Sequence, residues 1–402
     1  MADLASQDGR NVILAAAPDG TSALAAWESA FGDPLQAAAL GGGVWGPPAA
    51  VSERSAAAPA AAALGAGRFA VAWDGWNGDR RAVRIATRAP DGSWSPARDV
   101  SAAGGVRPRR PGVAATPSGG ALVAWGHDPA GAVMAAAVTP GGAVGPARAV
   151  LRDGDVRDVV PVVDAGGRRM VVWAQGGPAG WVVRAATAEG DGWSVPRTLS
   201  DAVPLVSDLR VAAGPGGHVA MVWRDELGGM RERVGLRVRG PDGTWGPRRT
   251  AGGEHVRPLG LPRPPGPPDQ SPAVAVAADG AVVVAWPERD GARDRVLWVR
   301  AAPGRAPGPA APVTASRASG APALAMAPDG TAAAVWEDLD GPRLTARIAL
   351  LPPSAGSWTG CRTLSPAGHE VAGPAVAWTG DGFTAAWAST NRGAVQRARV
   401  PR

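Results

Sequence analysis

An all-β fold, an eight-bladed β-propeller of four-stranded antiparallel blades, is predicted by three observations on the sequence. A short apolar segment that ends in Trp recurs eight times, and successive copies lie 46 to 63 residues apart. Apolar segments and tight turns precede and follow most of these copies. The last copy lacks a fourth segment, while residues 3–6 form a short segment that belongs to no complete copy. A period of about 50 residues with four strands in each copy is typical of a propeller.

The tryptophans that end the recurring segment are expected to pack between neighbouring blades, because repetition from copy to copy is what core packing requires. Each such ring buries about 150–250 Å². Five further tryptophans open the expected fourth strands, and Trp76 stands apart because it lies in a polar segment. The eight repeat tryptophans are Trp27, Trp73, Trp125, Trp173, Trp223, Trp286, Trp336 and Trp387.

The other strands of each blade follow from alternation and turn residues. Residues 83–88 alternate strictly between apolar and polar side chains, and a turn at Pro90-Asp91-Gly92 leads to the segment opened by Trp94. An Asp-Gly pair between alternating segments is a strong hairpin signal. Each unit therefore has its four strands connected as a meander.

The ends of the chain predict how the propeller closes. The last unit supplies three strands, and the N-terminal segment would add the fourth, which would remove two open sheet edges. The whole chain is thus expected to be a single propeller domain. Its predicted blades span residues 7–53, 54–103, 104–152, 153–202, 203–268, 269–316, 317–366, and 367–402 together with 1–6.

Composition and charge exclude several classes of partner. All 41 basic residues are Arg, and 35 acidic residues leave a net charge of only +6, which is spread along the chain. A nucleic-acid-binding protein would concentrate its positive charge in one stripe, so we expect no nucleic-acid partner. No apolar segment is long enough to span a bilayer, so we expect no membrane insertion. We expect a monomer.

The two faces of the predicted propeller differ. The turns between first and second and between third and fourth strands are short, whereas the other face carries longer and more charged connections, where binding residues usually lie. The longest of these connections, residues 251–271, contains a proline-rich segment, 262–268, that favours polyproline II. We predict a ligand-binding surface on this second face, formed by Asp74, Trp76, Asn77, Arg109, His127, Asp128, Arg224, Asp225, Glu288, Glu337 and Asp338.

No set of residues forms a catalytic or metal-binding signature. The four histidines are scattered, and the chain has a single cysteine. It contains no phosphate-binding Gly-Lys-Ser/Thr loop, no Gly-x-Ser-x-Gly motif and no His-Glu-x-x-His motif. We therefore expect no catalytic residue, no metal and no cofactor.

Two turns resemble the Asp-box of sialidase-like propellers, which are also called BNR repeat proteins. These turns are Asp91-Gly92-Ser93-Trp94 and Asp242-Gly243-Thr244-Trp245. The resemblance implies a propeller fold, and in the enzymes of that family it implies an arginine triad, a Tyr nucleophile activated by Glu, and an Asp acid/base. This chain contains no Tyr, so the resemblance extends to the fold only.

Two functional hypotheses follow. The first is a non-catalytic recognition or scaffold propeller that binds a glycan, a peptide or a protein partner on the second face. The alternative is a carbohydrate-active hydrolase or lyase that uses carboxylates at the mouth of the channel. Residues 1–10 are polar and form no signal peptide, so the sequence does not separate a cytoplasmic protein from an extracellular one whose leader has been removed.

Overall fold

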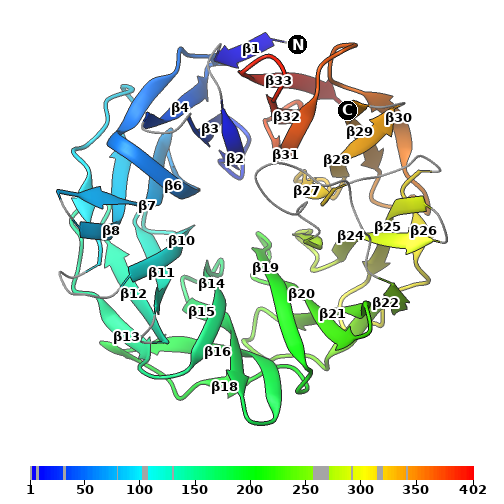
Figure 1. Cartoon of the computed structure of the whole chain (residues 1–402), viewed down its shortest axis with the longest axis horizontal. Helices are drawn as coiled ribbons and strands as arrows, with labels where there is room; N and C mark the ends of the chain where they lie inside the picture. Colours follow the sequence, from blue (N-terminus) through cyan, green and yellow to red (C-terminus); the bar gives the residue numbers. More distant parts are fainter. Residues whose placement is uncertain are drawn as a thin grey trace. The chain divides into compact units, whose positions relative to one another are not determined.

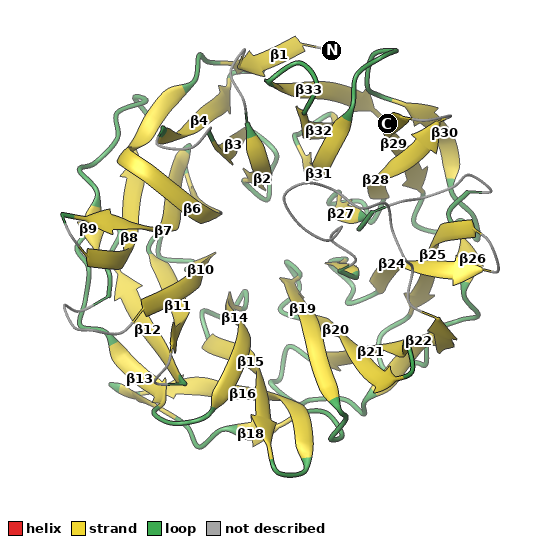
Figure 2. Cartoon of the chain, in the orientation of Figure 1, coloured by secondary structure: helices red, strands yellow, loops and turns green. Residues whose placement is uncertain are grey.

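The computed structural model describes residues 2–5, 9–29, 33–78, 80–101, 107–128, 131–256, 271–290, 293–314, 320–340 and 343–402. The chain forms two compact units, one of Ile13–Ala202 and one of Met1–Val12 with Val203–Arg402. Every regular element in the described residues is a β-strand, and all strand pairs are antiparallel (Figures 1 and 2). The all-β prediction is thereby confirmed.

The unit of Ile13–Ala202 consists of consecutive antiparallel meanders. Its strands are β2 (Arg10–Ala16, which begins just before the unit), β3 (Ser22–Glu28), β4 (Pro34–Gly41), β5 (Val44–Trp45), β6 (Ala49–Gly65), β7 (Arg68–Asn77), β8 (Arg80–Arg88), β9 (Arg98–Asp99), β10 (Arg107–Ala115), β11 (Ala121–Asp128), β12 (Ala132–Val138), β13 (Arg148–Leu151), β14 (Asp155–Val163), β15 (Arg169–Gly177), β16 (Gly180–Glu189), β17 (Gly192–Trp193) and β18 (Arg197–Thr198).

The second unit repeats the same pattern. Its strands are β19 (Leu205–Ala213), β20 (Val219–Gly228), β21 (Arg231–Arg239), β22 (Arg249–Val256), β23 (Ala273–Val276), β24 (Val282–Asp290), β25 (Arg293–Ala301), β26 (Ala311–Pro312), β27 (Ala323–Met326), β28 (Ala332–Asp340), β29 (Arg343–Leu351), β30 (Thr359–Thr363), β31 (Val371–Trp378), β32 (Gly382–Ser389) and β33 (Ala394–Pro401), together with β1 (Ala2–Ala5).

The two ends of the chain meet in one sheet of this second unit. The sheet has the order β1-β33-β32-β31, so its outermost strand comes from the N-terminus. Ala2 and Asp3 pair with Arg397 and Gln396, and the Gln396 amide donates a 2.9 Å hydrogen bond to Oδ1 of Asp3. The N-terminal segment therefore does supply a fourth strand to the last meander.

The repeat tryptophans are buried between consecutive sheets, as predicted. All eight are among the largest fully buried side chains of the described residues. Trp73 of β7 packs with Leu24 and Ala26 of β3, and Trp173 of β15 packs with Leu122 and Ala124 of β11. In the second unit, the same relation joins Trp387 to Val335 of the preceding sheet. Within each unit the ring thus faces the sheet that comes earlier in the chain.

The residue two positions after the tryptophan supplies a polar partner for the indole N–H in several sheets. The indole nitrogen of Trp223 donates to Asp225 Oδ1 at 2.7 Å, and that of Trp286 donates to Glu288 Oε2 at 3.1 Å. Trp173 makes the same contact with Gln175 at 3.2 Å. A buried indole N–H needs an acceptor, so these polar residues complete the core.

The first strands of several sheets contain a β-bulge with a left-handed residue. The positive φ falls on Ala58 (50°), Asp158 (49°), Asp208 (56°) and Gly373 (55°), and each lies at a register shift against the second strand. At Ala58 the backbone N–H donates to Oε1 of Glu28 in the preceding sheet, at 2.7 Å. Glu337 accepts from the backbone N–H of Gly373 in the same way, also at 2.7 Å. A carboxylate directly after the repeat tryptophan thereby ties one sheet to the bulge of the next.

We expect Glu28→Ala to lower the free energy of unfolding by about 1–2 kcal/mol, because the Ala58 N–H loses its charged acceptor. Chemical denaturation measures this loss. Glu28→Gln keeps an oxygen at the same place and should lose clearly less. Equal losses for the two variants would show that the N–H contact contributes nothing.

Candidate functional site

The most exposed aromatic side chain lies at the end of β7. All seventeen tryptophans fall in the described residues, and Trp76 is the exposed one among them, with 47% of its surface accessible. Large exposed apolar rings lose hydration free energy, so a single one on an otherwise polar hairpin indicates a contact surface. Trp76 is also one of the residues predicted from the sequence to bind a ligand.

Trp76 lies beside a buried ion pair. It stands opposite Arg81 in the β7–β8 ladder, and the Arg81 guanidinium reaches back along the strand to the carboxylate of Asp74, with Nε 3.1 Å from Oδ1. Burial raises the pKa of Asp74, and the charge and hydrogen bond of Arg81 oppose that shift. The pair fixes the strand end that carries the indole.

A second polar group forms where β8 meets β9. Asp99 accepts a hydrogen bond from the Asn77 amide, and its carboxylate also lies 3.2 Å from Nε of Arg84 and 3.4 Å from Nη2 of Arg80. Three donors on one carboxylate make a rigid cluster. Arg81, Arg84 and Asp99 were not among the predicted site residues, since their contacts depend on strand register.

The predicted site residues lie in strands, so the prediction that they occupy loops was wrong. The second strand of each meander runs two to four residues past the repeat tryptophan before it turns, because the ladder with the third strand continues there. Arg109 likewise belongs to β10. The side chains of Arg109 and Asp128 lie outside the described residues, as do residues 257–270 with their proline-rich segment.

Three of the predicted carboxylates are buried in contacts that hold strands together. Asp225 has no exposed surface and accepts from Trp223, from Nε of Arg233 at 2.9 Å, and from Arg248. Asp338 pairs with Arg347 at 2.8 Å. Glu337 accepts a hydrogen bond from the backbone N–H of Gly373. The contacts of these three groups stabilise the fold.

Arg224 and Glu288 belong to one polar network that includes a histidine. Arg224 Nη2 lies 2.6 Å from Asp208 Oδ2, and Arg224 Nη1 lies 3.4 Å from Glu232 Oε2. Glu232 Oε1 is 3.3 Å from His255 Nε2, and His255 Nδ1 is 3.5 Å from Glu288 Oε2. A buried imidazole thus lies between two carboxylates, with a guanidinium behind one of them.

The two histidines near predicted sites titrate in opposite directions. Burial lowers the pKa of His255, but the contact with Glu232 and the charge of Glu288 outweigh it, so that pKa lies above its usual value. Burial lowers the pKa of His127, whose ring centroid lies 6.1 Å from that of Trp125. His127 is therefore neutral at physiological pH, whereas His255 is the better proton donor.

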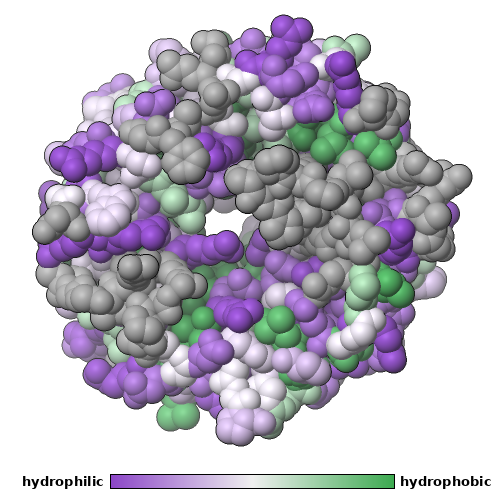
Figure 3. Space-filling model, viewed as in Figure 1, coloured by the Kyte–Doolittle hydropathy of each residue, from purple (hydrophilic) through white to green (hydrophobic). Residues whose placement is uncertain are grey.

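No group of three or more His, Cys, Asp or Glu in the described residues could hold a metal ion. The described part of the chain also contains no helix long and apolar enough to cross a membrane. On the face seen in Figure 3, hydrophilic residues predominate and the described apolar residues appear as separate small patches.

Comparison with known proteins supports the fold. No family model matches the sequence, and no curated protein matches it. Among solved structures, the chain is similar to the Dos1 propeller, with a TM-score of 0.60 and 9% identity over 98% of this chain and 93% of that one. It is also similar to an ulvan lyase, a polysaccharide lyase (TM-score 0.50, 11% identity, 84% of this chain and 90% of that one), and to the polysaccharide lyase Uly1 (0.51, 9%, 83% and 88%).

Together with the meanders, these likenesses define a β-propeller. The Asp-box resemblance applies to the fold in the same way. Asp91 Oδ1 accepts from the backbone N–H and hydroxyl of Ser93 at 2.9 and 2.7 Å, and Asp242 Oδ1 accepts from the Thr244 N–H at 2.9 Å. These are Asx turns that fix hairpins, and the hydrogen bonds to Ser93 lower the pKa of Asp91.

The raised pKa of His255 predicts a loss of stability on raising the pH. A histidine whose folded-state pKa exceeds its unfolded value of about 6.5 contributes full stabilisation below that value and loses it as the pH rises through the folded pKa. We expect the melting temperature to fall over this range, and expect His255→Gln to remove that part of the fall. Thermal melts of both proteins across the neutral range test this, and an unchanged difference between pH values in the variant would contradict it.

Proposed function

We propose that the chain is a closed eight-bladed β-propeller that acts as a non-catalytic recognition module. Closure is supported by the pairing of β1 with β33, and the blade number by the eight buried tryptophans at one position of the repeat. The ligand is a glycan, a peptide or a protein segment, bound where the second strands turn into the third.

The observation that carries this proposal is the exposure of Trp76. Its backbone is held in the β7–β8 ladder, and the Asp74–Arg81 pair orders the same strand end. A rigid aromatic side chain loses little conformational entropy on binding, which is why tryptophan dominates binding energy in many interfaces. Arg80 and Arg81 add positive charge and hydrogen-bond donors at its side.

The commitment of carboxylates to the fold supports recognition over catalysis. Acid–base chemistry on a glycosidic bond needs two carboxyl groups that face the substrate from about 5–10 Å apart. Asp74, Asp225 and Asp338 are instead buried and neutralised by arginines. Each would lose its structural contact if it took up or released a proton during a reaction.

A second candidate, a carbohydrate-active hydrolase or lyase, is favoured by one observation. His255 lies between Glu232 and Glu288, and its raised pKa suits a general acid. Arg224, in contact with Glu232, could hold an anionic group of a substrate. Release of reducing ends or unsaturated products from acidic polysaccharides, abolished by His255→Asn, would favour this candidate over recognition.

We expect Trp76→Ala to weaken ligand binding by about 2 kcal/mol, or roughly thirtyfold, as for a central interface tryptophan. The ligand is found by applying the labelled protein to glycan and peptide arrays, and affinities are then measured by calorimetry. Because Trp76 is exposed, the melting temperature should hardly change.

Met230→Ala is the matched control, since Met230 is half exposed at the corresponding hairpin between β20 and β21. It should leave binding unchanged if the site is at Trp76. A ligand held equally by the parent and Trp76→Ala, or no ligand from either array, would contradict the proposal.

Closure by β1 predicts a strong effect of Leu4, which is buried in the β1–β33 sheet. We expect Leu4→Asp to release β1, to lower the free energy of unfolding by about 2–3 kcal/mol, and to promote self-association through the exposed edge of β33. Denaturation and light scattering measure both effects. Ala2→Asp places the same charge at an exposed position of the strand and should be neutral, so equal behaviour of the two variants would argue against closure.

A further inference from the structure

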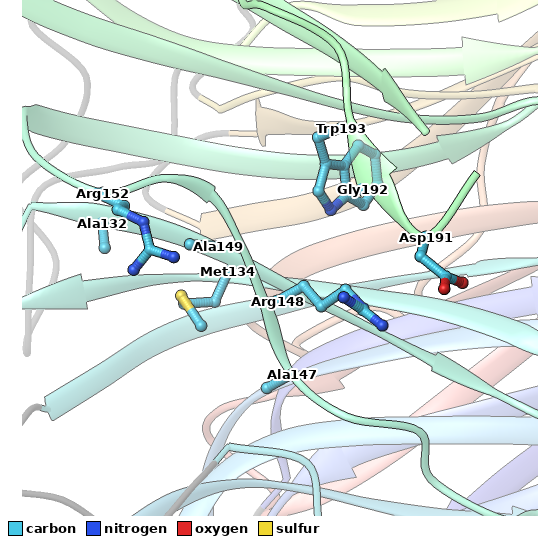
Figure 4. A pocket seen from close by; sticks show the side chains of 9 residues that line it. All are labelled: Ala132, Met134, Ala147, Arg148, Ala149, Arg152, Asp191, Gly192 and Trp193. Carbon is cyan, nitrogen blue, oxygen red and sulfur yellow. The ribbon is translucent and has the colours of Figure 1, made fainter. Parts of the chain in front are cut away.

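A cleft of about 460 Å³ lies in the unit of Ile13–Ala202, between β12 and β13 of one meander and β17 of the next (Figure 4). Small side chains leave this space open, because Ala132, Ala147 and Ala149 form one wall and Gly192 part of the other. The volume falls in the range of about 300–1,000 Å³ that is usual for small-molecule sites. No residue of the cleft belongs to the Trp76 surface or to the His255 network.

Two cations and one aromatic ring line the cleft. Arg148 and Arg152 are both exposed, and within the described part of the chain no ion pair joins either guanidinium to a carboxylate. Most arginines that approach a carboxylate elsewhere in the same unit are paired, such as Arg81 and Arg168. Two neighbouring cations without counter-charges attract an anion, and guanidinium groups bind carboxylates through two parallel hydrogen bonds.

The remaining lining restricts what kind of anion fits. Trp193 is half buried against the core of the preceding meander, so its ring is held in place at the cleft. In Figure 4, Asp191 lies on the side of the cleft away from Arg152, and the Arg148 side chain extends toward it. A carboxylate can only accept hydrogen bonds when ionised. A ligand with hydroxyl groups next to its acid group therefore matches this lining better than a bare anion or an apolar acid.

We propose that this cleft binds an acidic sugar residue, with its carboxylate on Arg148 and Arg152, its ring against Trp193 and a hydroxyl group on Asp191. The ring contributes apolar contact area, and the two guanidinium groups give selectivity for the charged sugar over its neutral counterpart. This site is separate from the Trp76 surface, and a glycan could occupy either one alone.

The test is calorimetric titration of the full chain with D-galacturonate, D-galactose and acetate. We expect galacturonate to bind about tenfold or more tightly than galactose, as the loss of charge-assisted hydrogen bonds implies, and more tightly than acetate, which lacks the ring. Arg148→Gln with Arg152→Gln should weaken galacturonate binding by a similar factor. Equal affinity for galactose, equal affinity for acetate, or no binding of galacturonate would each overturn the proposal.

Two control variants distinguish binding in the cleft from binding at the Trp76 surface and from attraction by overall charge. Arg197→Gln removes an exposed arginine of the same meander that does not line the cleft, and it should leave galacturonate binding unchanged. Trp76→Ala should also leave it unchanged, so failure of the recognition surface and failure of the cleft give different results. Weakening by Arg197→Gln to the same degree as by the double variant would mean that overall charge alone accounts for binding.

Discussion

The structure depends above all on the packing of the repeat tryptophan against the preceding sheet. Within each unit this ring fills the space between two sheets, and in several copies its N–H needs an acceptor two residues further along the strand. The acceptor must then be desolvated as well, which is costly for a carboxylate without a cation. Arg233 and Arg248 meet that requirement for Asp225. One apolar packing contact thus determines the identity of several polar residues around it.

This chain of requirements explains why polar residues at the strand ends were predicted as binding groups. From the sequence, a segment such as Glu337-Asp338 after an apolar strand has the composition of a charged loop. In the structure, Glu337 faces the bulge of the next sheet and Asp338 faces Arg347 on the neighbouring strand. Both contacts depend on register and on the order of the sheets. A single sequence contains neither, so the residue types were identified but their role was not.

The tryptophan period and the Asp-Gly turns, by contrast, could be predicted from local sequence. Each is specified within a few residues, as the Asx turn of Asp91 with Ser93 illustrates. The pairing of β1 with β33 was also predictable, since the last repeat lacked a strand and the N-terminus had one to spare. The cleft beside Trp193 could not be predicted. It arises because Ala147 and Ala149 of one meander stand near a ring of the next, and nothing in either segment alone indicates a space.

The same packing rule identifies the residues that remain available for binding. A tryptophan that completes a core is fully buried, and a carboxylate that caps it is neutralised, so neither can meet a ligand without weakening the fold. Trp76 follows a repeat tryptophan by three residues, beyond the last position that the interior requires, and Gly75 lets the Trp73 ring lie close against the backbone between them. Its ring therefore extends from a strand that is already fixed by Asp74 and Arg81. A binding group in this position can change between related chains without cost to the core, which is the property expected of a recognition surface on a repeat fold.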